Sequence, residues 1–146
     1  MFAMSRLLLI VLTLFLSACG QDDNITGDPD SPGYVATQYF YALYNHKDLE
    51  RATKYASPKL ARIMRSYGTA SQFARNLVNM QFDEVVIEQD RTEMSIRQQF
   101  GDRATINLIF TGYFQGNKVD DMRSVKMVRE GGDWIITEIV PDPFGR

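Results

Sequence analysis

Cysteine and histidine, the usual nucleophile and acid–base side chains near neutral pH and common metal ligands, are nearly absent from this chain. Its 146 residues include one cysteine, Cys19, and one histidine, His46. A single cysteine excludes an intrachain disulfide and a cysteine-based metal cluster, and a single histidine excludes a multi-histidine metal site. A Ser-His-Asp set would need His46, which lies beside Lys47 and Asp48 at an expected helix end, where a solvated histidine is typical. We therefore predict no catalytic residue, no metal site and no cofactor.

Glu138 is the one carboxylate whose position would direct it toward the interior. It alternates with Trp134, Ile136 and Val140, and alternate residues of a strand point to the same face. A buried carboxylate has a raised pKa and can act as a base. Pairing with a nearby arginine is the alternative, and we favour it.

Aromatic residues are the other candidates for a site. Tyr39, Tyr55 and Tyr67 lie on or beside apolar stripes, where they could present hydroxyl groups to a ligand. Packing in the core, with the hydroxyls at its edge, is the interpretation that we favour. The full set of candidate pocket residues is Tyr39, Tyr55, Tyr67, Phe110, Phe114, Trp134 and Glu138.

Two further groups of side chains could contact a partner. Tyr34 and Tyr41 fall away from the apolar side of the first expected helix, so they are candidates for a protein contact. Arg62 and Arg65 belong to a basic side of the next helices, which could touch anionic lipid or an acidic partner, although a solvated face is the common case. The whole chain has 16 basic and 18 acidic residues, so its charge gives no case for nucleic acid as a partner.

The first 18 residues have the pattern of a secretory signal. Arg6 precedes an apolar run from Leu7 to Leu16. A bilayer span needs about 20 apolar residues, so the pattern favours a cleaved signal over a permanent transmembrane helix.

The end of this segment, Leu16-Ser17-Ala18-Cys19, resembles the lipobox of bacterial lipoproteins. The resemblance implies cleavage between Ala18 and Cys19 and acylation of Cys19. Gly20 in the next position implies sorting to the outer membrane, facing the periplasm. An ordinary cleavage site that releases a soluble protein is the alternative.

The next segment is acidic and poor in apolar residues. Residues 21–32, QDDNITGDPDSP, carry four aspartates and no basic residue, which is typical of a disordered spacer. The sequence thus predicts a signal peptide (1–18), an acylated cysteine with a tether (19–32) and one domain (33–146).

Helical patterns occupy the first half of this domain. Ser-Pro at 31–32 and 57–58 and an aspartate at 48 are helix-start signals, and a further helix is expected from 69 or 71 to 79. In the helix that follows Ser57, the stripe expected to face inward is Leu60, Ile63, Met64 and Tyr67.

The periodicity then changes to two, which indicates strands at 82–90, 93–100, 103–114, 119–129 and 134–140. Short turns join them, so we expect a meander of sequential antiparallel neighbours. Helices followed by strands predict an α+β fold with N-terminal helices packed on a curled antiparallel sheet.

Three motifs in this order resemble the nuclear-transport-factor-2-like superfamily of cone-shaped α+β domains. They are Tyr39-Phe40-x-Ala42-Leu43, Lys47-Asp48-Leu49-x-x-Ala52-x-x-Tyr55-x-Ser57-Pro58 and Gly132-Asp-Trp134-x-Ile136. Within the superfamily, the chain is most similar to small bacterial lipoproteins of unknown function. The scaffold hosts enzymes, carriers and adaptors alike, so the resemblance implies a fold and not an activity.

Taken together, these patterns favour a lipid-anchored cell-envelope module that binds or assembles with an envelope protein and has no catalytic activity. The alternative is a carrier or an enzyme that uses the apolar pocket of the cone for a small amphipathic molecule.

Overall fold

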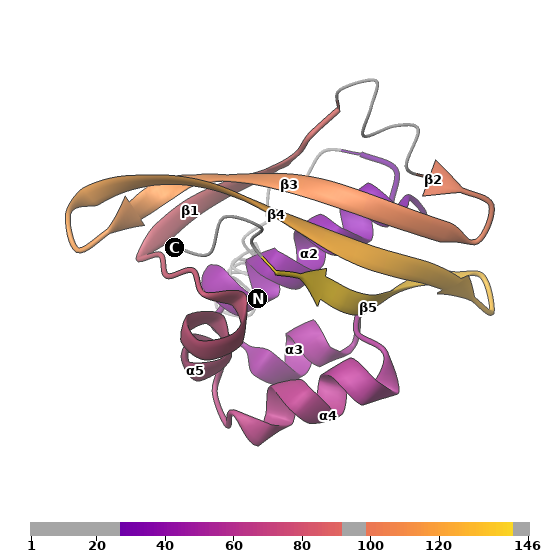
Figure 1. Cartoon of the computed structure of the whole chain (residues 1–146), viewed down its shortest axis with the longest axis horizontal. Helices are drawn as coiled ribbons and strands as arrows, with labels where there is room; N and C mark the ends of the chain where they lie inside the picture. The colour runs from indigo at the N-terminus through magenta and orange to yellow at the C-terminus, as the bar shows by residue number, and fades with distance from the viewer. Residues whose placement is uncertain (1–26, 92–98, 142–146) are drawn as a thin grey trace, which may run out of the picture.

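The computed structural model of the chain describes residues 27–91 and 99–141. In these residues the helical segments are α2 (Pro32–Tyr44), α3 (Leu49–Thr53), α4 (Pro58–Ser66), α5 (Ala70–Phe73) and η2 (Ala74–Val78). The strands are β1 (Glu84–Gln89), β2 (Gln99–Phe100), β3 (Arg103–Phe114), β4 (Asn117–Glu130) and β5 (Asp133–Val140). The helices lie on one side of a curled, open antiparallel sheet, which confirms the α+β class (Figure 1).

Side-chain caps fix the beginnings of four helices. In each case an oxygen of the capping side chain accepts a hydrogen bond from the backbone N–H three residues later, which satisfies one of the unpaired donors of the first turn. The capping residues are Ser31, Asp48, Ser57 and Thr69. The helix starts predicted at 31–32, 48 and 57–58 are therefore confirmed.

Helix α4 turns a slightly different face inward than its periodicity predicts. Leu60, Ala61 and Met64 are buried, whereas Ile63 is 37% exposed. The prediction that Ile63 faces the core is wrong, because the helix is turned so that its buried side passes through Leu60, Ala61 and Met64.

The sheet order is β1-β3-β4-β5, which differs from a simple meander. Strand β1 pairs with the far half of β3, from Glu84 opposite Tyr113 to Gln89 opposite Leu108. The two residues of β2 pair with the beginning of β3, on the same edge as β1. The expected pairing between the strands at 82–90 and 93–100 is wrong in the described residues, because the 12-residue β3 is long enough to pair with both. Residues 92–98 lie outside the described residues.

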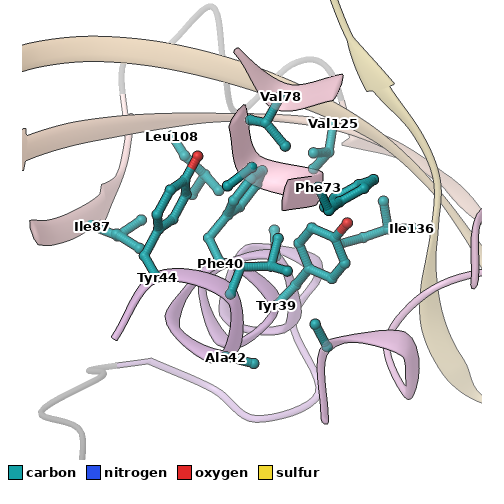
Figure 2. Close-up of a cluster of buried hydrophobic side chains, with 14 of the residues drawn as sticks. Tyr39, Phe40, Ala42, Tyr44, Phe73, Val78, Ile87, Leu108, Val125 and Ile136 are labelled. Carbon is teal, nitrogen blue, oxygen red and sulfur yellow. The ribbon is translucent and has the colours of Figure 1, made fainter. Parts of the chain in front are cut away.

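The core lies between α2 and the concave face of the sheet. Tyr39, Phe40 and Tyr44 point from α2 toward Leu108 and Val125 on the sheet (Figure 2). Phe40 packs edge-on against Phe110 of β3, with ring centroids 5.0 Å apart. Such contacts add to the burial of large apolar surfaces, so α2 is held firmly against the sheet.

Candidate functional site

Two of the predicted pocket residues fill the interior instead of lining a cavity. Tyr39 and Phe110 are both 0% exposed. The Tyr39 hydroxyl lies 3.4 Å from the sulfur of Met64 and donates to it. Burial, with a smaller contribution from Tyr44, raises the pKa of Tyr39 well above its ordinary value, so this hydroxyl stays neutral.

Tyr55 and Trp134 line a separate surface hollow of about 340 Å³, together with Tyr34 and Lys54. Trp134 itself is only 5% exposed, and the Arg129 guanidinium lies 6.0 Å from its ring centroid. Trp134 therefore presents little surface to this hollow.

Tyr67 and Phe114 belong to other surroundings. Tyr67 packs on Phe73, with ring centroids 5.7 Å apart. Phe114 is half-buried and lines a hollow of about 170 Å³ beside Lys47 and Arg75. The structure thus distributes the aromatic pocket candidates over the core and two distinct surface hollows.

Glu138 points to solvent, contrary to the inward direction that its alternation with Trp134 and Ile136 suggests. In the β4–β5 pairing, Lys126 lies opposite Glu138 but Met127 lies opposite Ile136, so Thr137 is an extra residue on β5. A β-bulge of this kind reverses the inside–outside alternation of the residues beyond it. Glu138 pairs with Lys126 at 3.0 Å, so the prediction of an arginine partner is also wrong, and both side chains are about half exposed.

The largest described hollow is a groove of about 600 Å³ between α2 and β1. The helix contributes Gly33, Tyr34, Thr37 and Tyr41, whose spacing places them along one side of α2. The sheet contributes residues 86–91, and the turn before the helix contributes Gly27 and Asp28. Both tyrosines predicted to contact a partner, Tyr34 and Tyr41, therefore line this groove. We define it as the α2–β1 groove.

Two contacts position α2 against β1. The Asn45 side chain donates a hydrogen bond of 3.2 Å to the carbonyl oxygen of Val85. The carboxamide of Gln89 lies against Gly33, where a Cβ atom would overlap it. These two contacts fix α2 and β1, which form the walls of the groove, to each other.

The side chains around the groove combine apolar and acidic groups. Val86 is 54% exposed, and Ile109, which lies opposite Glu88 on β3, is 36% exposed. Among the described residues, Asp28, Glu88 and Asp90 line the groove together with one base, Arg91. This arrangement can bind a ligand that has both apolar and basic groups.

The predicted basic contact residues lie elsewhere, on α4. Arg62 is exposed, but Arg65 holds Glu50 through Nε and Nη2, each at 2.9 Å from a carboxylate oxygen. The hydrogen bond from Arg65 lowers the pKa of Glu50, and the same bond raises the pKa of Arg65. Arg65 therefore ties α4 to α3.

Arg123 is a buried charge that the sequence did not single out. It is 4% exposed, pairs with Asp121 at 2.8 Å and donates to the carbonyl oxygens of Val78 and Asn79. These carbonyls end η2, so Arg123 joins that helix to the sheet. The nearby Tyr44 hydroxyl donates to the carbonyl oxygen of Met80, and burial raises its pKa.

The residues predicted to be cleaved and acylated, Ala18 and Cys19, lie outside the described residues. Of the stretch predicted as a tether, Asp28 to Ser31 form a hydrogen-bonded turn, in which Ser31 donates to the carbonyl oxygen of Asp28. This turn leads directly from the rim of the groove into α2.

Comparisons with family models, with curated proteins and with solved structures find no match to this chain. In residues 27–91 and 99–141, no group of three or more histidine, cysteine or carboxylate side chains is arranged to hold a metal ion. No helix in the same residues is long and apolar enough to span a membrane.

The sequence did not single out the β1 side of the groove. The signal was available, because Val86 is an apolar residue at an outward position of an alternating strand. An exposed Val86 indicates a contact surface only if β1 is at the edge of the sheet, and that position follows from the β1–β3 pairing.

Proposed function

We propose that this chain is a lipid-anchored binding module of the bacterial cell envelope, held at the inner face of the outer membrane and facing the periplasm. It acts without catalysis, by holding an envelope protein in its α2–β1 groove. The order of helices and strands and the curled open sheet also support a place in the nuclear-transport-factor-2-like superfamily.

The leader sequence supports the anchor. The only cysteine of the chain stands at the last position of Leu16-Ser17-Ala18-Cys19, directly after an apolar run. Two or more acyl chains on one protein give stable attachment to a membrane, whereas a single chain binds only marginally. Cys19 precedes Gly27 by eight residues, so the groove would lie within about 30 Å of the lipid surface.

One observation carries the binding role: the aromatic residues divide into two sets. Tyr39 and Phe110 fill the interior, whereas Tyr34 and Tyr41 remain at the α2–β1 groove. Tyrosine is enriched where proteins bind each other, because it offers a large apolar area and a polar end at a low entropic cost. Attachment to the membrane would raise the effective concentration of the module near its partner without any new contact.

The carrier or enzyme alternative has less support. It requires Tyr39, Phe110, Trp134 and Glu138 to surround one cavity. The first two are fully buried in the core, and Glu138 is on the solvent side of β5.

The anchor is tested by the mass of the mature N-terminal peptide. We expect a mature chain that begins at Cys19 and carries acyl chains, and we expect Cys19→Ser to accumulate as unprocessed precursor without acyl label. A Cys19→Ser chain that is secreted and cleaved normally would disprove the lipoprotein assignment.

The binding role is tested by photo-crosslinking in intact envelopes. A photoreactive residue at position 34 or 41 should give one discrete adduct, because both positions line the groove. A residue at Arg62 tests the basic α4 face instead, and one at Tyr113, which is 52% exposed on the outer face of the sheet, is the matched control. Equal adducts from all four positions would contradict a specific contact at the groove.

A further inference from the structure

The two edges of the sheet are covered differently. At the β5 edge, Ile136 exchanges two backbone hydrogen bonds of 2.8 Å with the segment after α3, one from its N–H to Tyr55 and one from Ser57. At the β1 edge, the hydrogen bond from another element that residues 27–91 and 99–141 supply comes from a side chain, Asn45, and reaches the carbonyl oxygen of Val85. The edge beyond Val85 faces the α2–β1 groove.

The register shows which backbone groups point into this groove. The N–H of Asp90 donates to Asn107 of β3, and in an antiparallel ladder such pairs recur at every second residue. Glu84, Val86 and Glu88 therefore bond to β3. The Val85 carbonyl, held by Asn45, points the other way. By the same alternation, the N–H and C=O groups of Ile87 and Gln89 point away from β3, toward the groove.

The dimensions of the groove suit an extended peptide. Residues 86–91 line one wall, which is about 20 Å of strand at 3.3 Å per residue. One side of α2 forms the opposite wall. A peptide seated between an edge strand and a helix forms main-chain hydrogen bonds with the strand and places alternate side chains against apolar surfaces.

The charges of the groove select among such peptides. Glu88 is exposed on β1, and Asp28 and Asp90 add two further carboxylates, against one base, Arg91, in the part of the lining that the structure describes. Residues 21–26 (QDDNIT), which precede Gly27 in the sequence, carry two aspartates and no base, so charge disfavours them as the occupant. Glu88 lies on the outward face of β1, whereas α2 lies on the inward side of the sheet. A segment with alternating basic and apolar residues can therefore place its basic side chains beside Glu88 and its apolar side chains toward Tyr34 and Tyr41 of α2.

We propose that the α2–β1 groove binds an extended apolar and basic segment of an envelope protein, which adds to the sheet as a strand beside β1. That the segment belongs to an envelope protein rests on the proposed function. The strand addition and the charge preference describe how the groove recognises such a segment. Main-chain hydrogen bonds to Ile87 and Gln89 supply the affinity, and Glu88 supplies the preference for basic side chains.

The test uses the full chain as the cell processes it, purified in detergent, and a labelled hexapeptide that alternates valine with lysine or arginine. Two N-methylated versions carry methyl groups on either the odd or the even residues. Only one edge of an added strand bonds to β1, so one methylated peptide should lose at least about tenfold in affinity while the other stays close to the parent. A glutamate version of the peptide should bind at least tenfold more weakly than the basic one.

Two matched variants locate the site. Glu84 and Glu88 are both exposed carboxylates on the outward face of β1, but only Glu88 lines the groove. Glu88→Lys should lower the affinity for the basic peptide about fivefold, and Glu84→Lys should leave this affinity unchanged. Both side chains are exposed, so neither change should disturb folding.

Strand addition is overturned if both methylated peptides bind equally well, or if the basic peptide fails to bind at concentrations up to about 1 mM, the range of weak recognition. Selection of basic segments is overturned if the glutamate peptide binds equally or if Glu84→Lys has the same effect as Glu88→Lys. These readouts are independent of Cys19 acylation and of crosslinking in envelopes, so the strand proposal can fail while the proposed function stands.

Discussion

Gly112 of β3 lies against the backbone carbonyl of Glu84 on β1, with no room for a Cβ atom between them. The ring of Phe82 and the Cα atom of Val85 lie 2.9 Å from the position that such a Cβ would take. Because these neighbours are mostly backbone atoms, they cannot move aside without shifting β1. The close contact therefore fixes the edge strand that forms one wall of the α2–β1 groove.

Gly112→Ala should destabilise the fold through this contact. Backbone displacement in a packed sheet costs more than repacking of a flexible side chain, so we expect a loss of about 2–3 kcal/mol in the free energy of unfolding, measured by urea denaturation. Gly33→Ala is the control, because the atoms that its Cβ would meet belong to the end of the Gln89 side chain. That variant should change stability by less than about 1 kcal/mol. Equal losses in the two variants would contradict the close backbone contact.

Arg123→Met should be costly because it leaves polar groups without their partner. The Arg123 side chain is 3% exposed. Its removal leaves Asp121 without its ion-pair partner and the carbonyl oxygens at the end of η2 without their hydrogen-bond donor. We expect a loss of about 3 kcal/mol in the free energy of unfolding. Lys118→Met on the same strand removes an ion pair with Asp120 in which both side chains are 58% exposed, so it should cost less than about 0.5 kcal/mol. Similar losses would show that Arg123 does not hold η2.

Asn45→Ala should loosen the edge strand without unfolding the domain. It removes the donor to the Val85 carbonyl, a hydrogen bond with a net contribution of about 1 kcal/mol. Amide hydrogen exchange of β1 should become faster. In Asn76→Ala, which removes hydrogen bonds only to the neighbouring Gln72, the exchange of β1 should stay as in the parent.

The Glu50–Arg65 pair predicts a pH dependence of known sign. The hydrogen bond from Arg65 lowers the pKa of Glu50 in the folded chain below its value in the unfolded chain. The ion pair therefore stabilises the fold fully at a pH above the pKa of Glu50 in the unfolded chain. This stabilisation is lost as the pH falls through the lower pKa of Glu50 in the folded chain. Arg65→Ala should raise the pKa of Glu50 toward the ordinary value of a glutamate, as followed by NMR titration of the carboxyl carbon. If Arg62→Ala on the same helix raised it equally, the assignment to Arg65 would be wrong.

Local signals in the sequence predicted most of the elements. The caps at Ser31, Asp48 and Ser57 require only residues a few positions apart, so the sequence contains all the information for them. The outward position of Tyr34 and Tyr41 on the first helix follows from periodicity, and both line the groove.

The wrong predictions concern features that depend on strand pairing between residues far apart in the sequence. The direction of Glu138 depends on a bulge at Thr137, which is visible only in the pairing with β4. The edge position of β1 depends on the length of β3, because the sequence order favours pairing with the next strand. The groove was not predicted for the same reason, since β1 had to be placed at the sheet edge before its two walls could be matched.

The central claim is that membrane attachment brings the α2–β1 groove to its partner, and one comparison tests it most directly. A photoreactive residue is placed at position 41 in two proteins, and the crosslinking yield of each is measured in envelopes. One is the native chain, and the other is a secreted form that carries Cys19→Ala behind an ordinary cleaved signal peptide. We expect the same adduct at a yield several-fold lower without the anchor, and recovery of the yield when the secreted form is overproduced, because attachment acts through effective concentration. An equal yield from the unanchored form at the same expression level would contradict it.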